Sequence, residues 1–194
     1  RTYVQKLKRC QATTSLEASS MLANWKQLLN TDCVVVGIGE HTLFPIFRVG
    51  QSTLMSICDR KYINHEIRHC EHIDIMIRDP EQRFVSGVNE YCRQNKIDVD
   101  VAWKLIDAGK LYDRHFTPQY LWLMHLYRFY KGPVTLRPLT HISRITDLHL
   151  HKSESKIEVP LCDRFIKVDQ CLTKHFNETE QLVDIIERYK NVLS

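Results

Sequence analysis

The sequence predicts a single-domain α/β protein in which helices flank a short, mostly parallel sheet. Two stretches, residues 45–56 and 73–91, each pass from an apolar run through a polar turn into a segment with helical spacing. Strands that alternate with helices in this way are typical of parallel sheets. A length of 194 residues suits one well-buried domain and is short for two. Because no repeat, linker or low-complexity tract interrupts the chain, we assign residues 1–194 to one domain.

The composition is that of a soluble globular protein, with 43% hydrophobic and 26% charged residues. The formal net charge of +4 is compatible with an anionic cofactor or an acidic acceptor. It is too small to indicate nucleic acid, which usually requires a clustered basic face. No apolar run is long enough to span a bilayer, so we expect no membrane segment in this chain.

The number and spacing of the cysteines indicate the cellular compartment. There are seven, an odd number, and none has C-x-x-C spacing, which disfavours both a disulfide framework and a cysteine-based zinc site. Free thiols are typical of a reducing compartment, and no signal peptide opens the chain, so we expect a cytoplasmic protein. The first residue is Arg1 and not Met, so the lumen of the secretory pathway is the alternative if an N-terminal anchor was removed.

The N-terminal third is expected to form a helix and a hairpin. The segment 14–17 has capping-box form and opens a helix that ends near Asn30. A β-rich run at 33–36 then turns through 37–41 into a second strand at 42–47.

The stretch that follows this hairpin has the outline of a phosphate-binding loop. Gly50 lets the backbone turn so that consecutive N–H groups point inward, and the next helix begins directly after it. No G-x-x-x-x-G-K-[ST] sequence is present, so this is not a Walker A loop. The side-chain donors would be Arg48, Gln51, Ser52 and Thr53.

The second strand-turn-helix stretch offers polar groups at a neighbouring strand end. Asp79 is a natural N-cap and Pro80 suits the first turn of a helix over 81–94. Arg78 would lie at the carboxyl end of the strand, and Ser86 about two turns into the helix. Because ligands bind at the carboxyl ends of strands in open α/β sheets, the two stretches together could hold opposite ends of one elongated anion.

Together the two stretches resemble the sulfotransferase family, which uses 3′-phosphoadenosine 5′-phosphosulfate (PAPS). Its members pair a loop [KR]-x-G-x-[ST]-[ST] with a downstream R-[DN]-P-x-x-R-x-x-S-x-x-x-x-Y, which matches here from Arg78 to Tyr91. The resemblance implies the P-loop, nucleotide-kinase-like sulfotransferase fold. It also implies that Arg78 and Ser86 bind the 3′-phosphate of PAPS, and that 3′,5′-ADP is the product. The loop that would bind its 5′-phosphosulfate end comprises Arg48, Val49, Gly50, Gln51, Ser52 and Thr53.

A rival motif lies between these two stretches. His65-Glu66-Ile67-Arg68-His69 reads H-E-x-x-H, the helical motif in which two histidines bind zinc and the glutamate acts as a base. A zinc metallopeptidase is therefore an alternative function. Against it, the stretch runs almost directly into the strand at 73, which leaves little room for a long active-site helix.

A helix over 99–108 precedes a third motif. Residues 113–119 read D-R-H-F-T-P-Q and resemble the D-x-H-[WF]-x-P-Q of carbohydrate sulfotransferases, where it lies near the acceptor. The resemblance makes a carbohydrate the expected acceptor and His115 a residue of its site.

The remaining segments follow in order. A buried helix is expected over 120–130, a strand over 134–137, and a short helix or loop over 142–148. In the polar loop after it, Lys152 and Ser153 resemble the family's residues that close over the adenosine end of the cofactor. Phe165, Val168, Leu172 and Phe176 have helical spacing, and 177–180 has capping-box form and is expected to open the last helix.

The expected reaction is in-line transfer of a sulfuryl group from PAPS to an acceptor hydroxyl. Arg48 would stabilise charge on the leaving phosphate. A sulfuryl group carries less charge than a phosphoryl group, so we expect no metal. Histidine suits proton abstraction near neutral pH, and both His65 and His115 are candidate bases, with Glu66 in reserve. A non-catalytic nucleotide-binding relative is the remaining alternative.

Overall fold

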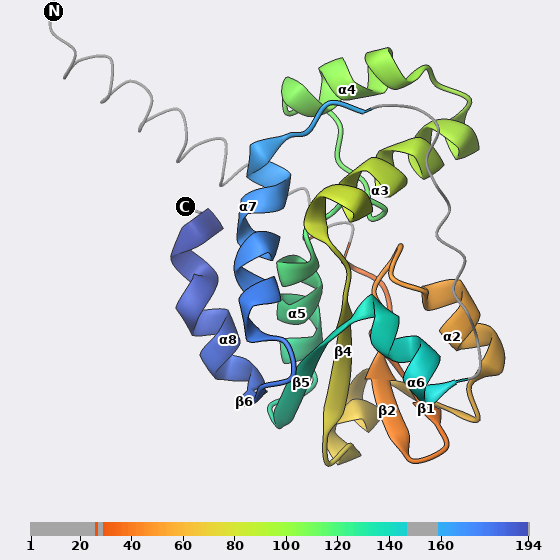
Figure 1. Cartoon of the computed structure of the whole chain (residues 1–194), viewed down its shortest axis with the longest axis vertical. Coiled ribbons are helices and arrows are strands. Elements are labelled where there is room, and N and C mark those ends of the chain that lie inside the picture. Colours follow the sequence, from red (N-terminus) through yellow and green to blue (C-terminus); the bar gives the residue numbers. More distant parts are fainter. Residues whose placement is uncertain (1–25, 27–28, 147–158, 194) are drawn as a thin grey trace, which may run out of the picture.

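The structure is a computed structural model that describes residues 26, 29–146 and 159–193. One six-stranded sheet, in the order β3-β1-β2-β4-β5-β6, runs through it with helices around it (Figure 1). The predicted α/β class is confirmed. The strands are β1 Val34–Ile38, β2 His41–Phe44, β3 Arg60–Ile63, β4 Ile73–Ile77, β5 Pro133–Pro138 and β6 Thr179–Gln181.

The sheet is mixed. Only the three central strands, β2, β4 and β5, run parallel, while β1 pairs antiparallel with both β2 and β3, and β6 pairs antiparallel with β5. The prediction of a mostly parallel sheet is therefore wrong for its outer strands. A tight hairpin accounts for the antiparallel pair β1–β2, since a short turn reverses the chain. β3 and β6 join the sheet antiparallel after longer connections that contain helices.

Helices connect and cover these strands. In Figure 1, α5, α7 and α8 stand on one side of β4 and β5, and α2 and α6 stand on the other, towards β1 and β2. The α-helices are α2 Gln51–Ile57, α3 Pro80–Asn95, α4 Val99–Asp107, α5 Gln119–Tyr127, α6 Ile142–Ile145, α7 Asp163–Leu172 and α8 Leu182–Tyr189. The 3₁₀ helices are η1 Asn64–His69, η2 Leu139–His141, η3 Thr173–His175 and η4 Lys190–Leu193. None of the helices in the described ranges is both long and apolar enough to cross a membrane.

Most of the local predictions are confirmed. The hairpin forms with Ile38 opposite His41, and Gly39 takes a positive φ of 56° at its turn. Asp79 caps α3, accepting a hydrogen bond from the Gln82 N–H at 2.8 Å, with Pro80 in the first turn. The predicted segments 99–108, 120–130 and 134–137 correspond to α4, α5 and β5.

The end of the chain departs from the prediction. Residues 177–180 do not open a helix, because Thr179–Gln181 extends as the edge strand β6 and pairs with β5, and α8 begins only at Leu182. Phe176 also lies outside the helix assigned to it, since α7 ends at Leu172. The N-terminal helix predicted to end near Asn30 falls almost wholly outside the described residues.

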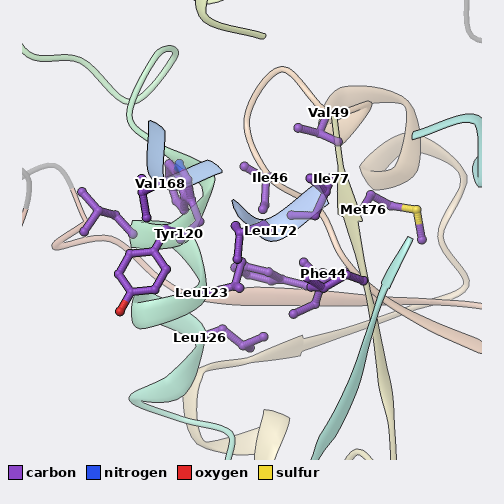
Figure 2. Close-up of a cluster of buried hydrophobic side chains, with 14 of the residues drawn as sticks. Phe44, Ile46, Val49, Met76, Ile77, Tyr120, Leu123, Leu126, Val168 and Leu172 are labelled. Carbon is purple, nitrogen blue, oxygen red and sulfur yellow. The ribbon is translucent and has the colours of Figure 1, made fainter. Parts of the chain in front are cut away.

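The core lies between the parallel strands and α5. All five residues of β4 are buried, as expected of a central strand covered on both faces. Figure 2 shows Leu123 and Leu126 of α5 facing Phe44 at the end of β2. Ile46 and Val49, both fully buried, belong to the same cluster. They anchor the chain on either side of Phe47 and Arg48, so the start of the loop between β2 and α2 is held by apolar packing.

Candidate functional site

A pocket of about 710 Å³ opens at the carboxyl ends of the parallel strands. Its walls come from the loop between β2 and α2, from the junction of β4 and α3, from the segment before α5, and from the turn after β5. This is the edge at which open α/β sheets bind ligands, and the volume suits a small-molecule site. Its main lining residues are Phe47, Arg48, Gly50, Gln51, Ser52, Thr53, Arg78, Asp79, Glu90, Arg114, His115, Leu139 and Phe176.

The loop before α2 turns through two residues with positive φ. Gly50 has a φ of 74°, which glycine adopts without strain, and Arg48 has a φ of 63°, which is uncommon for a residue with a side chain. The Val49 N–H donates to Ile46 O at 3.0 Å, which closes the turn around Arg48. Strained backbone of this kind concentrates at functional sites.

The Arg48 side chain reaches across to α3. Its guanidinium donates to the Ser86 hydroxyl from Nε at 3.1 Å and from Nη2 at 2.8 Å, and Nη1 lies 3.7 Å from Glu90 Oε2. Ser86 is buried and does not itself line the pocket. The resemblance assigned Arg48 and Ser86 to opposite ends of the cofactor, whereas here they are in direct contact. Ser86 therefore acts on the pocket through Arg48.

The Arg78 backbone is held in place by hydrogen bonds, and its guanidinium group has no ion-pair partner among the described residues. Gln119 of α5 accepts from the Arg78 N–H at 2.9 Å and donates to the Arg78 carbonyl at 2.9 Å. Nη1 donates to Arg48 O at 3.3 Å, and no carboxylate of the described residues pairs with the guanidinium. Burial, and then the charge of Arg48, lower the pKa of Arg78. An anion beside the two guanidinium groups would offset these effects, so the pair could hold an anion.

A buried arginine ties two walls of the pocket together. Arg83, the second arginine of R-D-P-x-x-R, donates from Nε to Phe47 O at 3.0 Å and from Nη1 to Thr117 O at 2.5 Å. Burial lowers its pKa to about 10, so it stays protonated at neutral pH. The motif resemblance includes Arg83 but implied no role for it. In the structure it holds the loop before α2 against the segment that carries His115.

A buried carboxylate supports the same region from α7. Asp169 accepts from the backbone N–H groups of Gln119 at 2.7 Å and Tyr120 at 3.0 Å, which caps the start of α5. Burial raises the pKa of Asp169 to about 6. No sequence signal indicated this residue, because the contact joins positions about fifty apart in the chain.

His115 lies in the pocket wall, almost buried. Asp113 Oδ1 is 2.5 Å from Nδ1 of the ring, and the Phe47 ring packs edge to face against it with centroids 5.7 Å apart. Arg114, next in the chain, is exposed and places its guanidinium 4.8 Å from the centre of the Phe47 ring. The pocket is thus lined by an imidazole that Asp113 orients and by the guanidinium groups of Arg48 and Arg78.

His65 lies elsewhere. It is exposed on η1, packs edge to face on Phe129 at 5.6 Å, and does not line the pocket. The structure therefore does not bring this candidate base to the site. Phe129 follows α5 at the end away from Gln119, whereas the Gln119 end supports the pocket.

The H-E-x-x-H segment also lacks the helix type that zinc binding by this motif requires. In an α-helix, positions four apart differ by about 40° around the axis, whereas in a 3₁₀ helix they differ by about 120°. Because η1 is a 3₁₀ helix, His65 and His69 do not share a face. Glu66, the reserve base, accepts a hydrogen bond from the Ile63 N–H at 2.9 Å and caps η1.

One group of three possible metal ligands occurs among the described residues, at His175, Glu178 and Glu180. Arg188 donates two hydrogen bonds to Glu180 and so places a positive charge within the group. The arrangement is that of a salt-bridge network around the β6–α8 junction, and none of the three lines the pocket.

The sequence-predicted site residues fall into four groups. Arg48, Gly50, Gln51, Ser52, Thr53, Arg78 and His115 line one pocket. Val49 and Ser86 are buried behind it, and the Val49 side chain points into the core (Figure 2), so only its backbone could meet a ligand. His65 lies outside it. Lys152 and Ser153 lie outside the described residues.

Comparisons with family models, with curated proteins and with solved structures found no match to this chain.

Proposed function

We propose that this protein is a sulfotransferase that moves a sulfuryl group from PAPS to an acceptor hydroxyl, on a carbohydrate. One observation carries the proposal. Three segments far apart in the sequence, each resembling a motif of that family, contribute to a single pocket: the loop from Arg48 to Thr53, Arg78 at the end of β4, and His115 before α5.

The charges of the pocket suit the phosphate groups of PAPS. Arg48 and Arg78 approach each other closely enough for the charge of one to lower the pKa of the other. Arginine is the side chain best suited to phosphate, because its planar donors bind two oxygens at once. Ser52 and Thr53 add hydroxyl groups at the start of α2. Since α2 has only seven residues, we attribute anion binding mainly to the two guanidinium groups.

His115 is the residue of this pocket best placed to take the acceptor proton. Asp113 engages Nδ1, so Nε2 is the ring nitrogen that would take the acceptor proton. When PAPS is bound, it supplies the sulfuryl group: the acceptor oxygen bonds to sulfur while the bond from sulfur to the 5′-phosphate oxygen breaks, and that electron pair leaves with 3′,5′-ADP. Arg48 would stabilise the negative charge that develops on the departing phosphate.

The arrangement favours this function over the zinc peptidase, because η1 does not present His65 and His69 on one face. It leaves a non-catalytic nucleotide-binding relative as the competitor, since such a protein would keep the anion site.

Transfer of label from ³⁵S-PAPS to a mixed pool of oligosaccharides tests the proposal. We expect labelled sulfate esters with the wild-type protein, and none with the Arg48→Ala variant. Arg68→Ala is the matched control, because Arg68 is an exposed arginine on η1 outside the pocket. Binding of 3′,5′-ADP without transfer to any acceptor would favour the non-catalytic relative, and absence of both would refute the proposal.

A further inference from the structure

The imidazole of His115 is constrained from its own segment. Asp113 Oδ1 lies 2.5 Å from His115 Nδ1 and also accepts from the His115 backbone N–H at 2.9 Å. One carboxylate oxygen thus engages both the ring and the backbone of the same residue. An ionised carboxylate can only accept hydrogen bonds, so in the neutral ring the proton must sit on Nδ1. The lone pair of Nε2 is then available to accept a proton.

The His115 backbone is constrained from α3. Gly87 lies in the interior of this helix, where glycine is less favourable than alanine, so its presence indicates a packing requirement. A Cβ placed on Gly87 would lie 2.2 Å from the His115 carbonyl oxygen and 2.7 Å from its carbonyl carbon. Both are backbone atoms, which cannot swing away as a side chain can. Only glycine therefore allows α3 to approach His115 this closely.

The same turn of α3 also serves the anion site. Ser86, adjacent to Gly87, receives both hydrogen bonds of the Arg48 guanidinium. Consecutive residues of one helix thus fix the loop that carries Arg48 and the backbone that carries His115. A side chain at position 87 would push these two parts of the pocket apart.

We infer that Asp113 and Gly87 are positioning residues for His115. Asp113 selects the ring tautomer whose Nε2 accepts a proton, and Gly87 sets the distance between the ring and the anion site. The catalytic meaning of this inference rests on the proposed sulfuryl transfer. The tautomer and the position of the His115 ring do not depend on that reaction, so both can be measured without an acceptor.

Nitrogen-15 NMR of the histidine rings tests the role of Asp113. The His115 signals are assigned by their loss in the His115→Asn variant. We expect the wild-type protein to show the Nδ1–H tautomer in the neutral ring, and Asp113→Ala to shift His115 to a mixture rich in Nε2–H. Asp100→Ala, which removes an exposed carboxylate from α4 outside the pocket, is expected to leave the signals unchanged. An unchanged tautomer in Asp113→Ala would overturn the assignment.

Kinetic and binding measurements separate the positioning role of Asp113 from the proposed sulfuryl transfer. We expect Asp113→Ala to reduce transfer by about 10²-fold while 3′,5′-ADP affinity changes by less than about twofold. Asp113→Glu, which restores a carboxylate, is expected to recover part of the rate. A shifted tautomer together with an undiminished rate would overturn the positioning role while leaving the proposed function intact. A wild-type protein that transfers nothing would instead refute the proposed function and leave the tautomer result standing.

Gly87→Ala tests the role of the close approach. We expect the folded variant to show displaced His115 ring signals and at least about tenfold slower transfer, because the methyl group must move backbone. Normal ring signals and a normal rate in a folded Gly87→Ala protein would overturn this part. If the variant does not fold, the required proximity of α3 to His115 is supported, and Asp113→Ala remains the decisive variant for positioning.

Discussion

Arg48 and Ser86 are joined by two hydrogen bonds, from Nε at 3.1 Å and from Nη2 at 2.8 Å to one hydroxyl oxygen. The contact links the loop before α2 to the second turn of α3, and it holds the guanidinium beside Arg78. A long arginine side chain loses considerable rotamer freedom when it is fixed in this way. In the proposed function, Ser86 therefore preorganises Arg48 for the anion before any ligand arrives.

We predict that Ser86→Ala weakens 3′,5′-ADP binding by about 3- to 10-fold. The change removes the hydroxyl that accepts from the Arg48 guanidinium, and a 3- to 10-fold loss corresponds to about 0.7–1.4 kcal/mol, while both arginines stay in place. Calorimetry measures the effect, and Ser56→Ala, an exposed serine of α2 outside the pocket, is the matched control. Equal affinities for the two variants would show that the Arg48 contact does not contribute to binding.

Gly50→Val should abolish 3′,5′-ADP binding while the protein remains folded. A β-branched residue is strained at a φ of 74°, and its side chain would enter the pocket. The comparison is Gly109→Val, which carries similar strain at a φ of 66° but lies outside the pocket. A folded Gly50→Val protein with normal affinity would remove the loop from the binding site.

The two candidate histidines should now behave differently. We expect His115→Ala to reduce transfer by roughly 10²–10⁴-fold with 3′,5′-ADP affinity nearly intact, because a base acts on the acceptor in the transition state. We expect His65→Ala to transfer at close to the wild-type rate, since His65 is exposed on η1 and outside the pocket. The reverse pattern would require a different arrangement of the site.

The lowered pKa of Glu90 predicts that its contribution to folding stability decreases in acid. The hydrogen bond from Arg93, with smaller contributions from Gln94 and Arg48, lowers the pKa of Glu90 to about 2, from about 4.5 in the unfolded chain. A lowered folded-state pKa contributes stability that is present above pH 4.5 and is lost as the pH falls towards 2. Glu90→Gln should therefore be less stable than wild type at pH 7, by about 1 kcal/mol or less, with a smaller difference at pH 3. Urea unfolding at the two pH values measures this, and a gap that widens in acid would contradict the assignment.

The sequence located the pocket because its signals there are local. The cap of α3 by Asp79 depends on residues three positions apart, and the strand that ends at Ile77 is one continuous apolar run. Once both strand ends were identified, the rule that ligands bind at the carboxyl edge brought Arg48 and Arg78 together. The positions of Arg48 and Arg78 could therefore be predicted from two local patterns, each of which spans fewer than about twenty residues.

The predictions that were wrong depended on distant contacts. Residues 177–180 match the capping-box pattern, yet Thr179 pairs with β5 and forms a strand. The local sequence contains no signal for this long-range pairing. The bonds from Arg83 to Phe47 and Thr117 span more than thirty positions and end on backbone carbonyls, which the sequence does not distinguish. In η1 the H-E-x-x-H sequence is present, but the segment forms a 3₁₀ helix, not the α-helix that would place His65 and His69 on one face.

Calorimetric titration of 3′,5′-ADP, with 5′-AMP as the comparison ligand, tests the central claim most directly. We predict saturable one-to-one binding to the wild-type protein, clearly tighter for 3′,5′-ADP because of its additional phosphate. In Arg78→Ala the 3′,5′-ADP affinity should fall by about 1.5–3 kcal/mol, and the 5′-AMP affinity by much less. Absence of 3′,5′-ADP binding to the wild-type protein, or equal losses for the two ligands in Arg78→Ala, would contradict the account.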